Sequence, residues 1–226
     1  MRKLSRILLV AGLFAGWGFA QQGSPEKSPT DAAQPDKEKP KGVIHIQQVE
    51  HMPEVHATQA CVNHSWAASL AAVLKVENAE IPQDAWLDKY YGGDVCMEQM
   101  GTPEELIRKG EGEYILEDGR HVEVKMQYFS GMPSNVSSLL VPIMQDEVLI
   151  LFVDGKAELL VGAMWDEYRS PRGERMIDLK ELYLLDPLLA GEKQKVVLET
   201  DSEDFAKISG FMKVKAVDPH PQYWPK

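Results

Sequence analysis

The sequence predicts an α+β domain in which most of the helices precede the strands. Residues 65–76 are rich in alanine and carry apolar side chains all round, a pattern typical of a buried central helix. From residue 147 onward, short runs of β-branched and apolar residues alternate with glycine and proline, a pattern typical of strands and turns. Because helical and strand segments are grouped along the chain, the pattern favours α+β over a doubly wound sheet.

The individual elements follow from local signals. We expect strands at 43–49, 147–153, 158–165, 176–185, 195–200 and 211–217, and helices at 65–76, 82–91, 102–109 and 134–144. The third helix has the clearest start, because Thr102 and Glu105 form a capping-box signature around Pro103. Pro142 limits the end of the fourth helix.

The N-terminus has the pattern of an export signal. Residues 1–20 combine three basic residues, an apolar run and a small-x-small cleavage site, as bacterial secretory signal peptides do. The alternative is an uncleaved N-terminal anchor. Residues 21–42 contain four prolines and no large apolar side chain, which predicts a disordered linker. The sequence therefore predicts a periplasmic or extracellular protein whose single folded domain spans residues 43–226.

The acidic composition of the chain argues against nucleic acid and anionic lipid as partners. The chain has 226 residues with 44% hydrophobic residues, as globular proteins do, and a net charge of -11. An acidic protein of this kind is repelled by phosphate backbones and lacks a basic patch for anionic lipid, so we expect neither as a partner. No paired Cys/His spacing or H-E-x-x-H motif occurs, so we expect no metal and no cofactor.

The chain has two cysteines, Cys61 and Cys96. In an oxidising compartment a disulfide is favoured over free thiols, and with two cysteines the pairing has one solution. Closing this loop stabilises a fold by about 4 kcal/mol on the chain-entropy account. The alternative is that one of the two is a reactive thiol.

The segment before the central helix carries a functional motif. Gln59 stands six residues before Ser65, which is followed by Trp66 and small residues. This arrangement resembles the active-site segment of papain-like cysteine peptidases, including the bacteriocin-processing and secreted-effector branches. A helix N-terminus favours a thiolate and, with a glutamine amide, stabilises an oxyanion. The resemblance implies that Ser65 occupies the nucleophile position, that Gln59 belongs to the oxyanion hole, and that Cys61 is a disulfide cysteine paired with Cys96.

The second half of the chain fits the same frame. The family carries its histidine near the start of a strand that runs to a Val-Gly pair, and residues 155–162 fit that pattern with Lys156 in the histidine position. The third catalytic residue corresponds to Asp186, which Pro187 follows. The resemblance implies a papain-like fold, in which an N-terminal helical half with a buried central helix packs on a C-terminal antiparallel sheet half.

Two departures from the family decide the expected chemistry. Serine replaces the nucleophilic cysteine at Ser65, and lysine replaces the histidine at Lys156. A serine hydroxyl needs a general base, and a lysine with an ordinary pKa of about 10.4 is protonated near neutral pH. We therefore expect a Lys156–Asp186 ion pair and no peptidase chemistry. The alternative is an active hydrolase with Lys156 as base for Ser65 and Gln59 in the oxyanion hole.

Three functions remain open from the sequence. The first is a non-catalytic module that binds a peptide or protein segment in the former substrate cleft, the second is the Ser65/Lys156 hydrolase, and the third is a structural exported domain with a closed cleft. Among the histidines, His64 directly precedes Ser65 and is expected to point elsewhere, and His51 and His56 are expected to be exposed loop residues.

Overall fold

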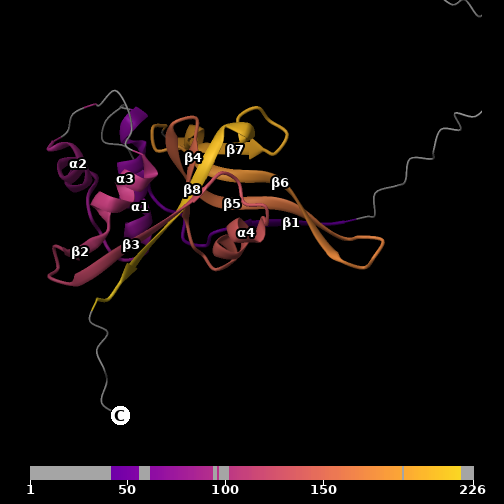
Figure 1. Cartoon of the computed structure of the whole chain (residues 1–226), viewed down its shortest axis with the longest axis horizontal. Helices are drawn as coiled ribbons and strands as arrows, with labels where there is room; N and C mark the ends of the chain where they lie inside the picture. The colour runs from indigo at the N-terminus through magenta and orange to yellow at the C-terminus, as the bar shows by residue number, and fades with distance from the viewer. Residues whose placement is uncertain (1–41, 56–61, 94–95, 97–101, 190, 220–226) are drawn as a thin grey trace, which may run out of the picture. The chain divides into compact units, whose positions relative to one another are not determined.

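The computed structural model describes residues 42–55, 62–93, 96, 102–189 and 191–219, all of which belong to one compact unit, residues 40–226 (Figure 1). The predicted signal peptide, residues 1–20, and residues 21–41 of the predicted linker lie outside the described residues. No helix within the described ranges is long and apolar enough to cross a membrane.

Helices and strands appear in the order that the α+β prediction requires, with one exception discussed below. The helices are α1 (Ser65–Val76), α2 (Gln83–Tyr91), α3 (Pro103–Gly110) and α4 (Ser137–Met144). The strands are β1 (Val43–Gln48), β2 (Gly112–Ile115), β3 (His121–Ser130), β4 (Leu149–Val153), β5 (Lys156–Arg169), β6 (Arg175–Leu185), β7 (Lys195–Glu199) and β8 (Ile208–Val217). Short 3-10 turns lie at η1 (Val62–His64), η2 (Gly191–Gln194) and η3 (Phe205–Lys207).

The described strands form one antiparallel, open sheet with the order β2-β3-β8-β4-β5-β6-β7. β1 pairs antiparallel with the outer part of β5, from Gly162 to Glu167, whereas β4 pairs with the inner part, from Lys156 to Leu160. The change of partner requires a glycine. A Cβ at Gly162 would lie 2.7 Å from the carbonyl oxygen of Gln47, so only glycine lets β1 approach β5 so closely.

α1 is the buried central helix, as predicted, and its bounds match the prediction. It packs against β4, β5 and β8, and Trp66, Leu70 and Leu74 are almost completely buried. The Trp66 ring lies 4.4 Å, centroid to centroid, from the ring of Tyr90 on α2, so the aromatic side chains join the two helices. In Figure 1 the first three helices gather at one end of the sheet, and the β5–β6 hairpin extends from the other.

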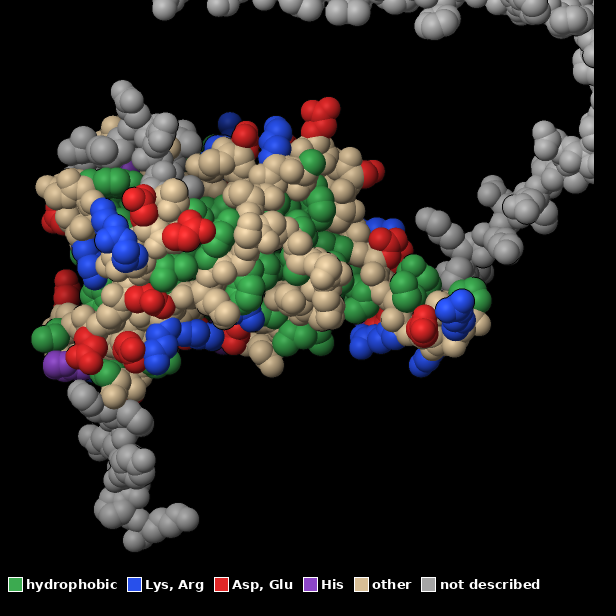
Figure 2. All heavy atoms as spheres, viewed as in Figure 1, with side chains coloured by type: hydrophobic (Ala, Val, Ile, Leu, Met, Phe, Trp, Pro, Cys, Tyr) green, Lys and Arg blue, Asp and Glu red, His purple; other side chains and the backbone are tan. Residues whose placement is uncertain are grey.

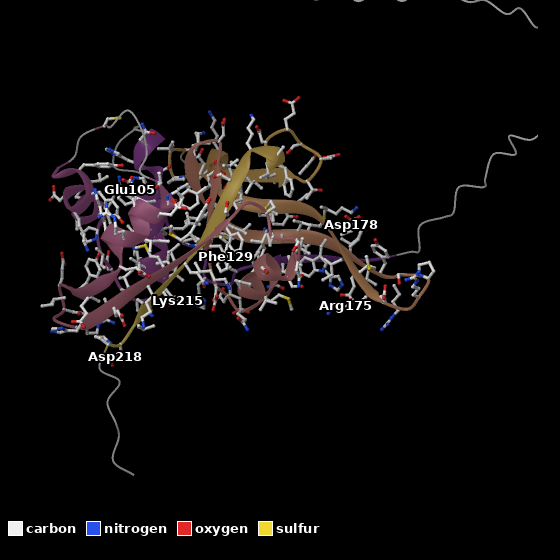
Figure 3. The ribbon with its side chains drawn as sticks, viewed as in Figure 1. Glu105, Phe129, Arg175, Asp178, Lys215 and Asp218 are labelled. Carbon is white, nitrogen blue, oxygen red and sulfur yellow. The ribbon has the colours of Figure 1, made fainter. Side chains whose placement is uncertain are left out.

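The capping-box prediction for α3 is confirmed. The Thr102 hydroxyl accepts from the backbone N–H of Glu105, and the Glu105 carboxylate accepts from the backbone N–H of Thr102, both at 3.3 Å. Glu105 is labelled in Figure 3. Lys215 of β8 is also labelled in Figure 3. Its Nζ lies 2.9 Å from Glu77 Oε1 and 3.0 Å from Glu147 Oε1, so this side chain connects the end of α1 to the start of β4.

The prediction missed the β2–β3 hairpin, because no strand was expected between residues 111 and 133. β3 nevertheless has a regular period of two: Val122, Val124 and Met126 are buried, and the intervening side chains are more exposed. Charged residues at the intervening positions made this segment less apolar than the strands after residue 147. The α+β class is therefore correct, but helices and strands are less strictly separated along the chain than expected.

Candidate functional site

Ser65, the residue in the predicted nucleophile position, is the first residue of α1 and is fully buried. Its hydroxyl oxygen accepts a hydrogen bond from the backbone N–H of Ala157 at 2.9 Å. Ser69, one helical turn later, donates its hydroxyl to the backbone C=O of the same Ala157 at 3.0 Å. We call these two serines and the Ala157 backbone the serine clamp. It fixes the start of α1 to the start of β5.

The turn between β4 and β5 leaves the backbone groups of Ala157 without a hydrogen-bond partner on a neighbouring strand. Asp154 and Gly155 both have positive φ, of 48° and 75°, and form the two-residue turn of the β4–β5 hairpin. In such a hairpin Ala157 directs its backbone groups away from β4, toward β6. The ladder between β5 and β6 begins only at Leu159, which pairs with Leu185. The serine hydroxyls therefore satisfy backbone groups that lie beyond the last strand pair.

Lys156 and Asp186 form the ion pair that the sequence predicts. The Lys156 Nζ lies 3.5 Å from Asp186 Oδ2, and the exposed fractions of the two side chains are 37% and 5%. Asp186 directly follows β6, and its Oδ1 accepts from the backbone N–H of Leu188 at 2.8 Å. The carboxylate therefore orders the turn after β6 and binds the lysine at the same time.

The structure thus brings together three of the four predicted site positions. Ser65 contacts the backbone of Ala157, the neighbour of Lys156, and Lys156 contacts Asp186. The fourth position, Gln59, lies outside the described residues, so its place in an oxyanion hole stays a prediction. The predicted cleft also depends on residues 56–61, which lead into α1 and lie outside the described ranges.

This geometry does not provide the groups that hydrolysis requires. Ser65 uses its oxygen to accept from a backbone amide, and the lysine that would activate it is bound to a carboxylate. A serine nucleophile needs a base that takes its proton, and an ammonium paired with a carboxylate has no free lone pair for that proton. The arrangement favours a structural role for Ser65 and Lys156 over the alternative dyad.

Glu158 is a member of this cluster that the sequence analysis did not identify. It lies on β5 opposite Leu151 of β4, and only 7% of its surface is exposed. The pKa of this carboxyl is raised to about 7, chiefly by burial and then by the nearby charge of Asp186, whereas the charge of Lys156 acts in the opposite direction. A charged residue at the start of an apolar strand run is a weak signal, because such residues often lie in turns.

Three of the described histidines have partners other than Ser65. His45 stacks on Trp165 with ring centroids 5.2 Å apart, and the exposed His51 binds Asp146. His64 is fully buried and stacks on Tyr91 with centroids 6.3 Å apart. Within the described ranges, no group of three or more His, Cys, Asp or Glu side chains is arranged to hold a metal. His56 lies outside the described residues.

The predicted disulfide stays a prediction. Cys96 is described and exposed, but Cys61 lies outside the described residues. Comparison with known proteins adds no assignment, since no protein-family model matches the chain and no curated protein matches it. The resemblance to papain-like peptidases therefore depends on the residues of the motif alone.

The serine clamp predicts that Ser65 is needed for stability. Replacing Ser65→Ala leaves the buried Ala157 N–H without its acceptor, so we expect the free energy of unfolding to fall by about 1–3 kcal/mol. Ser138→Ala, on an exposed position of α4, is the matched control and should have almost no effect. Urea denaturation of the three proteins measures the difference. Equal stability of both variants would exclude a structural role for the Ser65 hydroxyl.

The raised pKa of Glu158 predicts that the folded protein loses stability as pH rises. The unfolded carboxyl loses its proton near pH 4.5, whereas the folded one keeps it up to about pH 7. Because the native state binds more protons in this window, its stability falls as pH rises through it, by on the order of 3 kcal/mol at most. Glu158→Gln stays neutral, so the variant should gain stability relative to wild type between about pH 5 and about pH 8.

Denaturation of wild type and the Gln variant at both pH values checks this expectation. Glu203→Gln, at an exposed position, is the control and should show no such gain. A constant difference between wild type and Glu158→Gln at the two pH values would contradict the raised pKa.

Proposed function

We propose that this chain is an exported domain with a papain-like fold that has lost peptidase chemistry and binds an extended peptide or protein segment. The proposal rests on one observation: the side chains at the three positions that the family uses for catalysis form contacts within the fold. Ser65 is held in the serine clamp, and Lys156 is paired with Asp186. Ser65 contacts the backbone of the residue next to Lys156, and the polar groups of all three positions are used to hold the fold.

The order of elements supports the papain-like part of the proposal. In the family frame the nucleophile opens a buried helix, the histidine begins a strand and the third residue ends the neighbouring strand. Ser65 opens α1, Lys156 begins β5, and Asp186 follows β6, which pairs with β5. The order of these elements along the chain, over the 121 residues from Ser65 to Asp186, is the order that the resemblance implies, and it supports the proposal.

The surface beside these positions supports binding. Leu189, in the turn that Asp186 orders, has 41% of its surface exposed and donates its backbone N–H to the C=O of Asp186. Lys156 is also partly exposed there. An apolar side chain and a cationic group at one place suit a peptide, which offers apolar side chains together with backbone carbonyls or a carboxylate. The net charge of -11 disfavours nucleic acid at this surface.

Restoring the family residues tests the papain-like frame. In the double variant Ser65→Cys with Lys156→His, the cysteine would lie at a helix N-terminus beside an imidazole, so its thiol should have a lowered pKa. We expect the ultraviolet absorbance of its thiolate to titrate with a pKa below the ordinary value of about 8.5, a readout that needs no reagent to reach the buried position. Ser69→Cys, buried on the same helix one turn away, is the matched control, and wild type gives the background of the native cysteines. An unshifted thiol pKa in the double variant, or the same pKa in the Ser69→Cys control, would contradict the frame.

Photo-crosslinking tests the binding function. A photoreactive amino acid in place of Leu189 should capture members of a library of unstructured peptides, and recovered peptides should be uncleaved. The control is the same amino acid in place of Ile115, which is 72% exposed on the edge strand β2. Capture at position 189 alone supports the proposal. Cleaved peptides, with cleavage lost in Ser65→Ala, would favour the hydrolase, and absence of capture at 189 would favour a purely structural domain.

A further inference from the structure

β1 has one edge that the rest of the described chain does not cover. Its six residues pair only with β5. The backbone N–H of Val49 donates to Val161 of β5, so by the alternation of a strand the N–H and C=O groups of Ile44 and Ile46 point away from β5. Among the described residues these outward groups have no hydrogen-bond partner. β1 therefore presents an edge on which another strand can pair.

Exposed apolar side chains gather at this edge. Those on β1, on the turn after it and on α4 are Val43, Ile44, Ile46, Met52, Val141 and Met144, with exposed fractions between 43% and 66%. α4 contacts β1, and Asp146, just after α4, accepts from the backbone N–H groups of Glu50 and His51. Figure 2 shows hydrophobic side chains on the surface around α4. An apolar patch of this kind is typical of a protein–protein contact.

The charge pattern indicates what pairs there. β1 contains no Lys, Arg, Asp or Glu, whereas the edge strand β7 carries Lys195 and Glu199, and the edge strand β2 has four residues and carries Glu113. Charges and short length are the usual protection of an edge strand against self-association. Two copies of a chain with a net charge of -11 repel one another, so they approach most easily along an edge without charge.

We propose that β1 is a dimer contact, where β1 of a second copy pairs antiparallel with it about a two-fold axis at His45. In this register Ile44 lies opposite Ile46 of the second copy, and the two exchange both backbone hydrogen bonds. The four isoleucines then share one face of the joined sheet. The same axis brings Val43 of the second copy opposite Gln47, close to the end of β1 that α4 and Asp146 contact. We call this contact the β1 interface.

The β1 interface is independent of the proposed peptide site, because it involves none of the residues of that site. It is also small. One strand pair with the adjoining apolar side chains buries less than the roughly 1,200–2,000 Å² of stable complexes. The proposal therefore requires a weak dimer whose population rises with protein concentration.

A pair of substitutions on two edge strands tests the proposal. Light scattering after size-exclusion chromatography of the purified full chain, over a concentration series, measures the dimer fraction. We expect Ile46→Lys to weaken the dimer about tenfold or more, because each dimer loses two buried isoleucines and gains two like charges. Val197→Lys on β7, at a position 55% exposed, is the matched control and should leave the dimer unchanged. A monomer at all concentrations, or a dimer that Ile46→Lys leaves intact, would overturn the proposal.

A cross-link tests the register. In the proposed pairing His45 faces its own copy in a non-hydrogen-bonded pair, where two cysteines are close enough for a disulfide. His45→Cys should therefore give a covalent dimer on mild oxidation, seen on a non-reducing gel and absent from wild type. Val197→Cys is the control and should remain monomeric on the same gel. Equal cross-linking of the two variants, or none in His45→Cys, would exclude this register.

Discussion

The attachment of α1 to β5 is the constraint on which the rest of the structure depends. Two serine hydroxyls, one helical turn apart, hold both backbone groups of Ala157. This contact joins the helical half to the sheet at the turn of the β4–β5 hairpin, and β5 in turn pairs with β1, β4 and β6. A backbone amide that is buried without an acceptor is costly, so the position of α1 on the sheet is specified by polar contacts as well as by apolar packing.

Features that depend on a few neighbouring residues could be predicted from the sequence, whereas features that depend on contacts between distant residues could not. The α1 bounds and the α3 cap were predicted correctly, because alanine content and a capping box act within a few residues. β3 was missed because Glu123 and Lys125 obscure its apolar period, although both lie on its more exposed side. The role of the Ser65 hydroxyl could not be predicted from local sequence, since its partner lies 92 residues away. Glu158 was missed for the same reason, because its burial depends on its neighbours in the folded sheet.

The Lys156–Asp186 pair was predicted because the family resemblance supplied the long-range information that local patterns lack. It placed a cation at the start of one strand beside an acid at the end of the next, and elementary electrostatics predicted the ion pair. The resemblance does not reach every part of the site, however. Gln59 and Cys61 lie outside the described residues, so the oxyanion-hole and disulfide predictions still depend on the motif alone.

The two departures from the peptidase pattern have a common physical explanation. Asp186 and Glu158 place two carboxyl groups in a largely buried position, and Lys156 supplies a long side chain whose charged end reaches Asp186 while remaining 37% exposed. A neutral side chain there would leave Asp186 without its cationic partner. A serine hydroxyl is likewise a better acceptor than a thiol for the Ala157 amide. Ser65 and Lys156 therefore both suit a fold in which these polar groups stabilise the attachment of α1 to β5 and the turn after β6.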